Sequence, residues 1–167
     1  MGWNVSALYY TTFESPVGPL LLAGDSKALH SVSFESSKRA ARPKSDWKQD
    51  GAAFDEVIRQ LQAYFSGELR EFDVPLAMEG TEFQLLVWNA LRTIPYGETI
   101  SYGQLAERIG NPKAVRAVGL ANGSNPIPII VPCHRVIGSD GSLTGFGGGL
   151  STKKMLLDLE SKQRRLL

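Results

Sequence analysis

The sequence contains very little cysteine and histidine, and this limits the chemistry it can support. Cys133 is the only cysteine among 167 residues, so an internal disulfide is excluded. The two histidines, His30 and His134, lie far apart in the chain, so a zinc site built from Cys and His ligands is not expected. We therefore expect neither a bound metal nor a cofactor. A lone thiol also favours a reducing compartment, which indicates the cytoplasm.

Long apolar runs and strong net charge are missing as well. No run approaches the ~20 apolar residues that span a bilayer, and the start lacks the pattern of a signal peptide, so no membrane association is expected. The net charge of +1 gives no strong attraction to nucleic acid. The charge is unevenly distributed, however. Residues 1–78 carry 8 Lys and Arg against 10 Asp and Glu, whereas residues 79–167 carry 10 against 7. A nucleic acid would therefore bind the second half.

The first half has the pattern of a small α/β unit. Alternating, β-branched and aromatic residues predict strands at 5–12 and 28–34, and a short apolar run predicts another at 19–23. The Pro- and Gly-containing segment 15–19 is a turn between the first two strands. Residues 36–51 are polar and basic, which is typical of a surface loop.

A helix is expected to follow this loop. Gly67 is placed to end it. Its apolar positions fall at helical spacing, at Phe54, Val57, Ile58, Leu61 and Phe65. We expect this first unit to end near Met78.

The second half is predicted to be mainly helical. Thr81 and Gln84 form a capping box, and Pro95 ends the helix that follows. Ser101 and Gln104 form a second capping box. The first of these helices has a broad apolar face made by Phe83, Leu86, Val87, Ala90, Leu91 and Ile94.

Two short helices follow in the pattern of a helix-turn-helix. Gly110 closes the first, Asn111 is expected to cap the second, and Pro112 suits its first helical position, giving a helix over 113–121. Ala114, Ala117, Val118 and Ala121 give this helix a small and smooth surface, and Arg116 is its one charged residue after Lys113. Such a surface suits a DNA backbone or minor groove better than base reading in the major groove. A tightly packed buried helix that binds no DNA fits the same pattern.

The chemical centre is the proline-rich segment 125–138. Its three prolines exclude a helix interior and a central strand, so 129–131 is expected to be a buried extended stretch that presents Cys133. His134 can act as a base, through a bridging water, and Arg135 can supply positive charge to stabilise a thiolate. A buried, inert cysteine is the alternative.

The C-terminal part could complete such a site. Glu160 or Asp158 could orient the histidine, as carboxylates do in other Cys/His sites. Residues 145–149 form a glycine loop around Phe146 that could lie against a flat ligand, although a plain flexible loop fits equally. A last helix over 152–160 is expected, with a frayed basic tail at 161–167.

The residues around Cys133 resemble a known family. Pro132–Val136 is similar to the active-site signature of the methylated-DNA–protein-cysteine methyltransferases, also called O6-alkylguanine-DNA alkyltransferases. The resemblance runs from Gly80 to Glu160 and is carried in order by Ile94–Thr99, Ser101–Gly103, Ala114–Gly119, Asn125-Pro126 and Gly147–Gly149. The first half resembles the family's N-terminal domain less specifically, through Ser15–Gly18 and Tyr64–Gly67.

This resemblance implies an α+β fold of two domains. Residues 1–78 would form an N-terminal α/β domain of the ribonuclease-H-like kind. Residues 79–167 would form a mainly helical domain for DNA binding and alkyl transfer, with the helix-turn-helix and the active-site cysteine loop.

The resemblance also implies the catalytic roles. Cys133 would accept the alkyl group. His134 would draw the thiol proton through a water, and Glu160 would hold His134. Asn125 would brace the active-site turn, and Tyr102 would donate to the ring nitrogen of guanine as it leaves. Since a thioether is not readily hydrolysed and no second cysteine exists, each molecule would act once.

DNA binding follows from the same resemblance. Arg116 would enter the base stack where the damaged nucleotide has been flipped out, and backbone groups of Cys133 and Val136 would read the guanine edge. The DNA-binding residues would be Ser101, Tyr102, Lys113, Ala114, Arg116, Ala117 and Arg135. The substrate pocket would be lined by Tyr102, Val136, Phe146 and Gly147.

The implied partner is double-stranded DNA that contains alkylated bases. O6-alkylguanine is the expected substrate, whereas activity on O4-alkylthymine and cooperative binding along DNA are left open. We expect a monomer, associated with the nucleoid if the source is bacterial. Some family members bind zinc in the N-terminal lobe, but His30 is the only Cys or His there, so no metal is expected. Gly147 stands where some relatives have a serine, which leaves one pocket hydrogen bond open.

Three other functions fit parts of this sequence. A non-catalytic lesion sensor on the same fold would lack the acceptor Cys133. A transcription regulator would need more base-reading side chains on 113–121 and a dimer to match paired half-sites. A cysteine hydrolase would turn over, and its activity would not need DNA.

Overall fold

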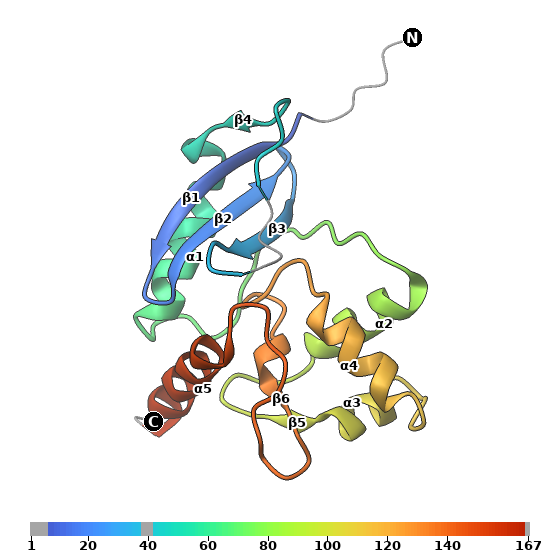
Figure 1. The fold of residues 1–167 in the computed structure, drawn as a ribbon. Helices are drawn as coiled ribbons and strands as arrows, with labels where there is room; N and C mark the ends of the chain where they lie inside the picture. Colours follow the sequence, from blue (N-terminus) through green and yellow to red (C-terminus); the bar gives the residue numbers. More distant parts are fainter. Residues whose placement is uncertain (1–6, 38–41, 166–167) are drawn as a thin grey trace. The chain divides into compact units, whose positions relative to one another are not determined.

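The computed structural model describes residues 7–37 and 42–165, shown as a ribbon in Figure 1. The chain forms two compact units, Met1–Met78 and Glu79–Leu167. Each unit has its own core.

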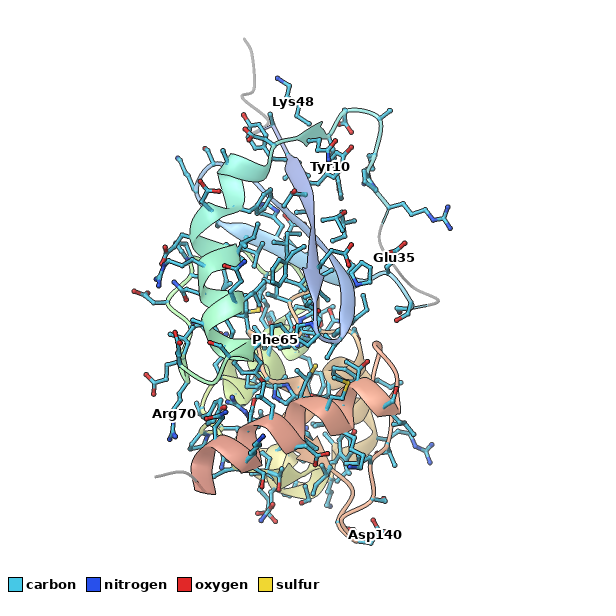
Figure 2. The ribbon with its side chains drawn as sticks, turned by 90° about the vertical axis from the view of Figure 1, so that its left-hand side faces the viewer. Tyr10, Glu35, Lys48, Phe65, Arg70 and Asp140 are labelled. Atoms are coloured by element: carbon cyan, nitrogen blue, oxygen red, sulfur yellow. The ribbon has the colours of Figure 1, made fainter. Side chains whose placement is uncertain are left out.

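The first unit is built on a four-stranded sheet with the strand order β3-β2-β1-β4. Strands β1 (Tyr9–Ser15), β2 (Gly18–Gly24) and β3 (Leu29–Phe34) are antiparallel neighbours, and the short β4 (Lys48–Gln49) pairs parallel to β1. Figure 2 shows Tyr10 and Lys48 at the same end of this sheet. The three expected strands are confirmed.

The strand boundaries differ from the sequence prediction. The first strand continues to Ser15, whose hydroxyl donates to the carbonyl of Gly18 across the hairpin at 2.6 Å. The Gly18 backbone has φ +96°, which glycine adopts without strain. Val5 and Ser6, at the start of the expected strand, lie outside the described residues. The expected loop 36–51, of which 38–41 also lie outside, contains β4, formed through backbone bonds that the side-chain pattern does not reveal.

Helix α1 (Asp55–Phe65) packs on the sheet after a 3₁₀ turn, η1 (Gly51–Phe54), as Figures 1 and 2 show. The helix ends before Gly67, which has φ +84°, as its sequence predicts. Tyr64, rather than the expected Phe65, is the buried aromatic of the last turn.

The second unit contains four α-helices among its described residues: α2 (Glu82–Leu91), α3 (Tyr102–Arg108), α4 (Val115–Gly123) and α5 (Leu150–Arg165). A pair of two-residue parallel strands, β5 (Ile100–Ser101) and β6 (Val136–Ile137), joins segments distant in sequence (Figure 1). Both capping boxes are confirmed, because Thr81 and Ser101 each exchange hydrogen bonds with the glutamine three residues later.

The start of α4 was predicted wrongly. Asn111 does not cap it. The Asn111 carbonyl instead accepts from the amide of Ala114 at 3.0 Å, which closes a turn around Pro112, and the helix begins at Val115. Proline fixes φ equally well in a turn and in a first helical turn, so its position alone does not separate the two. The helix-turn-helix pair itself, α3 and α4, is present.

Trp88 connects two helices of this unit. It is buried on α2, and its Nε1 donates to the carbonyl of Ala121 on α4 at 2.8 Å. The tryptophan therefore fixes α4 from behind, on the side opposite its exposed face.

The last helix is longer than expected. It begins at Leu150, two residues before the predicted start, and continues to Arg165, so the segment expected to fray is helical as far as that residue. Good helix formers such as Lys162 and Gln163 favour this extension. Residues 166 and 167 of the expected tail lie outside the described residues. Among the residues the structure describes, no helix is long and apolar enough to cross a membrane.

Candidate active site around Cys133

The segment before Cys133 is a compact turn rather than the extended stretch expected from its prolines. The amide of Val131 donates to the carbonyl of Ile127 at 2.9 Å, and Ile129 has φ +75°, the only positive φ at a non-glycine residue in the described chain. The Asn125 side chain closes the turn, accepting from Ile127 N at 2.9 Å and donating to Val131 O at 2.7 Å. One amide side chain thus supplies the bonds that a neighbouring strand would otherwise give.

Cys133 begins a short 3₁₀ turn, η2 (Cys133–Arg135), and is only 5% exposed. Burial raises the pKa of its thiol to about 11, while the Asn125 amide and the positive charge of Lys153 act in the opposite direction. The cysteine is therefore held as a neutral thiol until something removes its proton.

The next residue, His134, is completely buried against a carboxylate from the last helix. Its Nε2 lies 2.7 Å from Oε2 of Glu160. Burial lowers the pKa of His134, and the hydrogen bond to Glu160 opposes this. An ionised carboxylate only accepts hydrogen bonds, so Nε2 carries the proton and Nδ1 is left as an acceptor. That Nδ1 has no hydrogen-bond partner among the described residues.

Glu160 is the hub of this buried cluster. Its Oε1 accepts from Nε of Arg135 at 2.8 Å and from the backbone amide of Gly97 at 3.2 Å. Its Oε2 accepts from Nη2 of Arg135 at 3.1 Å. Burial alone would raise the pKa of Glu160, but the bonds and charges of His134 and Arg135 outweigh it and hold the pKa well below its usual range. The carboxylate therefore stays ionised and fixes the tautomer of His134.

Two sequence-based expectations about this cluster are wrong. Arg135 was expected to contact DNA and to supply the charge near Cys133. Its side chain is buried instead, bound to Glu160 and to the carbonyl of Ile94 at 2.7 Å, because it balances the carboxylate. Asp158, the alternative partner for the histidine, is exposed and pairs with Lys154.

Lys153 was missed by sequence reasoning. It is buried, and its Nζ donates to the carbonyl of Val136 at 2.6 Å and to the carbonyl of Thr144 at 3.0 Å. Burial lowers its pKa, and it is the cation that acts on Cys133. A signal was available, because Lys153, Leu156 and Glu160 fall at i, i+3 and i+7, on one face of α5.

Tyr102 comes to the same place from the start of α3. Its hydroxyl donates to the carbonyl of Thr144 at 3.1 Å, and Nζ of Lys153 lies 5.9 Å from the centre of its ring. Tyrosine and lysine thus share one backbone acceptor.

The residues predicted to line a pocket lie in β6 and in the glycine loop. Val136 is buried in β6 and bound to Lys153. The half-buried Phe146 and the exposed Gly147 follow Thr144 in the glycine loop. Figure 2 shows Asp140 in the turn that precedes this loop.

Helix α4 presents one exposed face beside the site. Arg116 and Ala117 are exposed on it, as is Lys113 in the preceding turn, while Ala114 is half-buried. A methyl group at Gly119 would lie 3.8 Å from the ring of Tyr102, which places this face next to the tyrosine. Ser101 is half-buried and is engaged in capping α3.

Within the described ranges, no three His, Cys, Asp or Glu side chains lie close enough together to hold a metal ion.

Known proteins match both halves of this chain. Residues 8–78 match the ribonuclease-like domain of 6-O-methylguanine DNA methyltransferase, and residues 82–162 match its DNA-binding domain. A methylated-DNA–protein-cysteine methyltransferase of Methanosarcina acetivorans is 60% identical over 153 residues, covering 92% of this chain and 98% of the relative. One of Mycobacterium tuberculosis is 55% identical over 157 residues, covering 93% and 94%.

Solved structures give the same assignment. Mycobacterium tuberculosis OGT in complex with DNA is 54% identical, with a TM-score of 0.88 over 93% of this chain and 94% of that one. The expected two-domain α+β fold, with a ribonuclease-like first domain and a helical DNA-binding second domain, is confirmed. On the strength of both halves and of these relatives, the chain belongs to the 6-O-methylguanine DNA methyltransferase family.

Proposed function

We propose that this protein repairs DNA by moving the alkyl group of O6-alkylguanine onto Cys133, once per molecule. The observation that carries the proposal is a buried cysteine beside a histidine whose Nε2 is held by an ionised carboxylate and whose Nδ1 has no partner in the described chain. This arrangement suits removal of one proton from one thiol. A thioether product is stable to water, and the chain has no second cysteine to release it.

The first step is proton removal. With its pKa near 11, the thiol of Cys133 is almost wholly protonated at neutral pH. Nδ1 of His134 accepts this proton through a bridging water, and the imidazolium that forms is stabilised by Glu160. Adjacent residues point in different directions, which is why a water rather than direct contact makes the link.

The second step is displacement at the alkyl carbon. A bond forms between the Cys133 sulfur and the alkyl carbon, and the bond from that carbon to O6 breaks, its electron pair remaining on guanine. The hydroxyl of Tyr102 donates a proton to the ring nitrogen of the departing base. Nζ of Lys153, near the tyrosine ring, favours both the thiolate and the developing phenolate.

Substrate access requires that the damaged nucleotide leave the duplex, because a base inside the stack cannot reach a buried thiol. In this proposal Arg116 occupies the place that the base leaves, while Ser101, Lys113, Ala114 and Ala117 lie along the DNA backbone. Val136, Phe146 and Gly147 line the pocket for the flipped base. The protein acts as a monomer on double-stranded DNA that contains alkylated bases.

The test is the mass of the protein after reaction. Mixing it with a duplex that carries one O6-methylguanine should add one methyl group, on the Cys133 peptide, capped at one per molecule. The matched variant Cys133→Ser should still bind the duplex but gain no mass. Repeated turnover would favour a hydrolase, and binding by the wild type without methyl gain would favour a lesion sensor.

A further inference from the structure

Helix α4 carries a large apolar side chain that remains exposed in the folded protein. Leu120 is 73% exposed, more than any other large hydrophobic residue in the described chain. Exposing a leucine to this extent forfeits the stabilisation that burial would give, so a role outside the folded chain is a natural explanation.

The position of Leu120 on the helix is specific. Arg116, Leu120 and Gly123 follow one another at i, i+4 and i+7, and all three are exposed, so they share one face. The opposite face is buried and consists of Val118, Ala121 and Asn122.

The surroundings make Leu120 protrude. On one side of Leu120 lie Gly119 and Gly123, which carry no side chain, and on the other side lies the small Ala117. The carbonyl of Leu120 accepts from the hydroxyl of Ser124 at 2.6 Å, which fixes the last turn of the helix. Arg116 and Leu120 therefore project one turn apart from a surface whose other side chains are small or absent.

We propose that Leu120 is an apolar wedge that enters the minor groove beside Arg116 and holds open the base step from which the damaged nucleotide leaves. This inference rests on the proposed function. Proteins that open the minor groove commonly insert a single leucine, isoleucine, methionine or phenylalanine between bases. Arg116 can form hydrogen bonds with the unpaired base, whereas Leu120 can replace lost stacking with apolar contact.

DNA fits this face better than a protein partner does. The residues beside Leu120 are a cation, Arg116, and glycines, with Lys113 exposed in the preceding turn, so a positive and narrow surface surrounds one apolar projection. A protein-binding surface is normally a contiguous apolar patch. The helix also lies inside the segment that matches a DNA-binding domain.

The experiment compares Leu120→Ala with Leu86→Ala. Leu86 is the matched control, because it is also an exposed leucine, at 49%, but lies on α2. Each protein is given three substrates: an O6-methylguanine duplex, the same strand alone, and free O6-benzylguanine. Leu120→Ala should slow transfer from the duplex about tenfold, which corresponds to loss of one leucine contact. Transfer from the single strand should fall far less, and transfer from the free base should not change.

A second variant tests whether a long apolar side chain at position 120 is sufficient for the effect. Leu120→Met keeps a long apolar side chain and should restore most of the duplex rate. A 2-aminopurine placed beside the lesion should brighten when wild type binds, because it is unstacked, and should brighten less with Leu120→Ala.

The outcomes are distinct. The wedge proposal would be overturned if Leu120→Ala left the rate of transfer from the duplex unchanged, or if it slowed transfer from all three substrates equally. Equal slowing in Leu86→Ala would overturn it too. Failure of the wild type to transfer an alkyl group to Cys133 from any of the three substrates would instead overturn the proposed function on which the wedge rests.

Discussion

The two units of the molecule differ in where they keep their charged side chains. In the described part of the first unit, the buried polar side chains are the uncharged Thr11 and Gln60. Its Arg59–Glu56 ion pair is exposed, and its His30–Asp25 pair is half-buried. Among its described residues, the second unit buries four ionisable side chains besides its cysteine: His134, Arg135, Lys153 and Glu160.

This difference separates stability from chemistry. Taking charges out of water is costly, and a buried ion pair is often no more stabilising than apolar residues of the same size. The first unit shows that this chain can build a core without such groups. The buried charges of the second unit all surround Cys133, directly or through His134, so the reaction at that cysteine accounts for them better than stability does.

The largest expected effect tests the buried cluster against an exposed pair. Glu160→Gln removes the charge that balances Arg135 and orients His134, and should lower the free energy of unfolding by about 3–5 kcal/mol. Glu56→Gln, in the exposed pair, should leave urea denaturation unchanged within error. Equal effects of the two substitutions would contradict the contrast between the units.

Acid should affect the same cluster. Because the pKa of Glu160 is lower in the folded chain, its contribution is present above the unfolded value of about 4.3 and is lost as pH falls below it. Trp88 reports on the second unit and Trp47 on the first, so single-tryptophan variants can follow each unit. In the Glu160→Gln variant, the free energy of unfolding of the second unit should fall less steeply as the pH is lowered.

The next effect comes from the reaction itself. A methyl group on Cys133 enters a site that is only 5% exposed, and overpacking of this kind costs about 1–3 kcal/mol. The methylated protein should melt at a lower temperature, with Trp88 responding before Trp47. An unchanged melting temperature would show that the site has room for the product.

Two adjacent lysines on α5 allow a buried charge and an exposed charge to be tested within one helix. Lys153→Met removes the cation that lowers the Cys133 pKa, so the thiolate is less populated and methyl transfer should slow about tenfold. Lys154→Met, at an exposed position, should react like wild type. The rates are measured by quenched-flow mass spectrometry. Similar rates for both variants would remove Lys153 from the mechanism.

The smallest expected effect belongs to the first unit alone. Gly67 ends α1 with φ +84°, so Gly67→Ala should cost about 1 kcal/mol in strain. The loss should appear in thermal unfolding followed at Trp47. Methyl transfer at a temperature where both proteins are folded should not change, and a slower transfer would mean that the first unit contributes to the reaction.

Local signals in the sequence predicted much of this fold. The capping boxes at Thr81 and Ser101 depend on residues three apart, and the helix stop at Gly67 depends on one residue's backbone, so no tertiary information is needed. The pairing of His134 with Glu160, across 26 positions, came from family resemblance and agrees with the geometry.

The features that the sequence did not predict depend on contacts with side chains from other parts of the sequence. The turn at Ile129 exists because the Asn125 side chain bonds to its backbone, and the burial of Arg135 exists because Glu160 comes back to it from α5. Lys153 lacks any local sign of burial except its helical spacing with Leu156 and Glu160. The small residues of 113–121 predicted a smooth helix surface, and the exposed Leu120 interrupts that surface.

The buried thiol also determines how long an unused molecule remains useful. With a pKa near 11, roughly one Cys133 in ten thousand is a thiolate at neutral pH, and oxidants and simple alkylating agents attack thiolates. A reagent that can be consumed only once must survive storage in a cell that contains such compounds. Burial slows the inactivation of the unused thiol. The repair capacity at the moment of damage therefore depends on the number of copies present and not on their age.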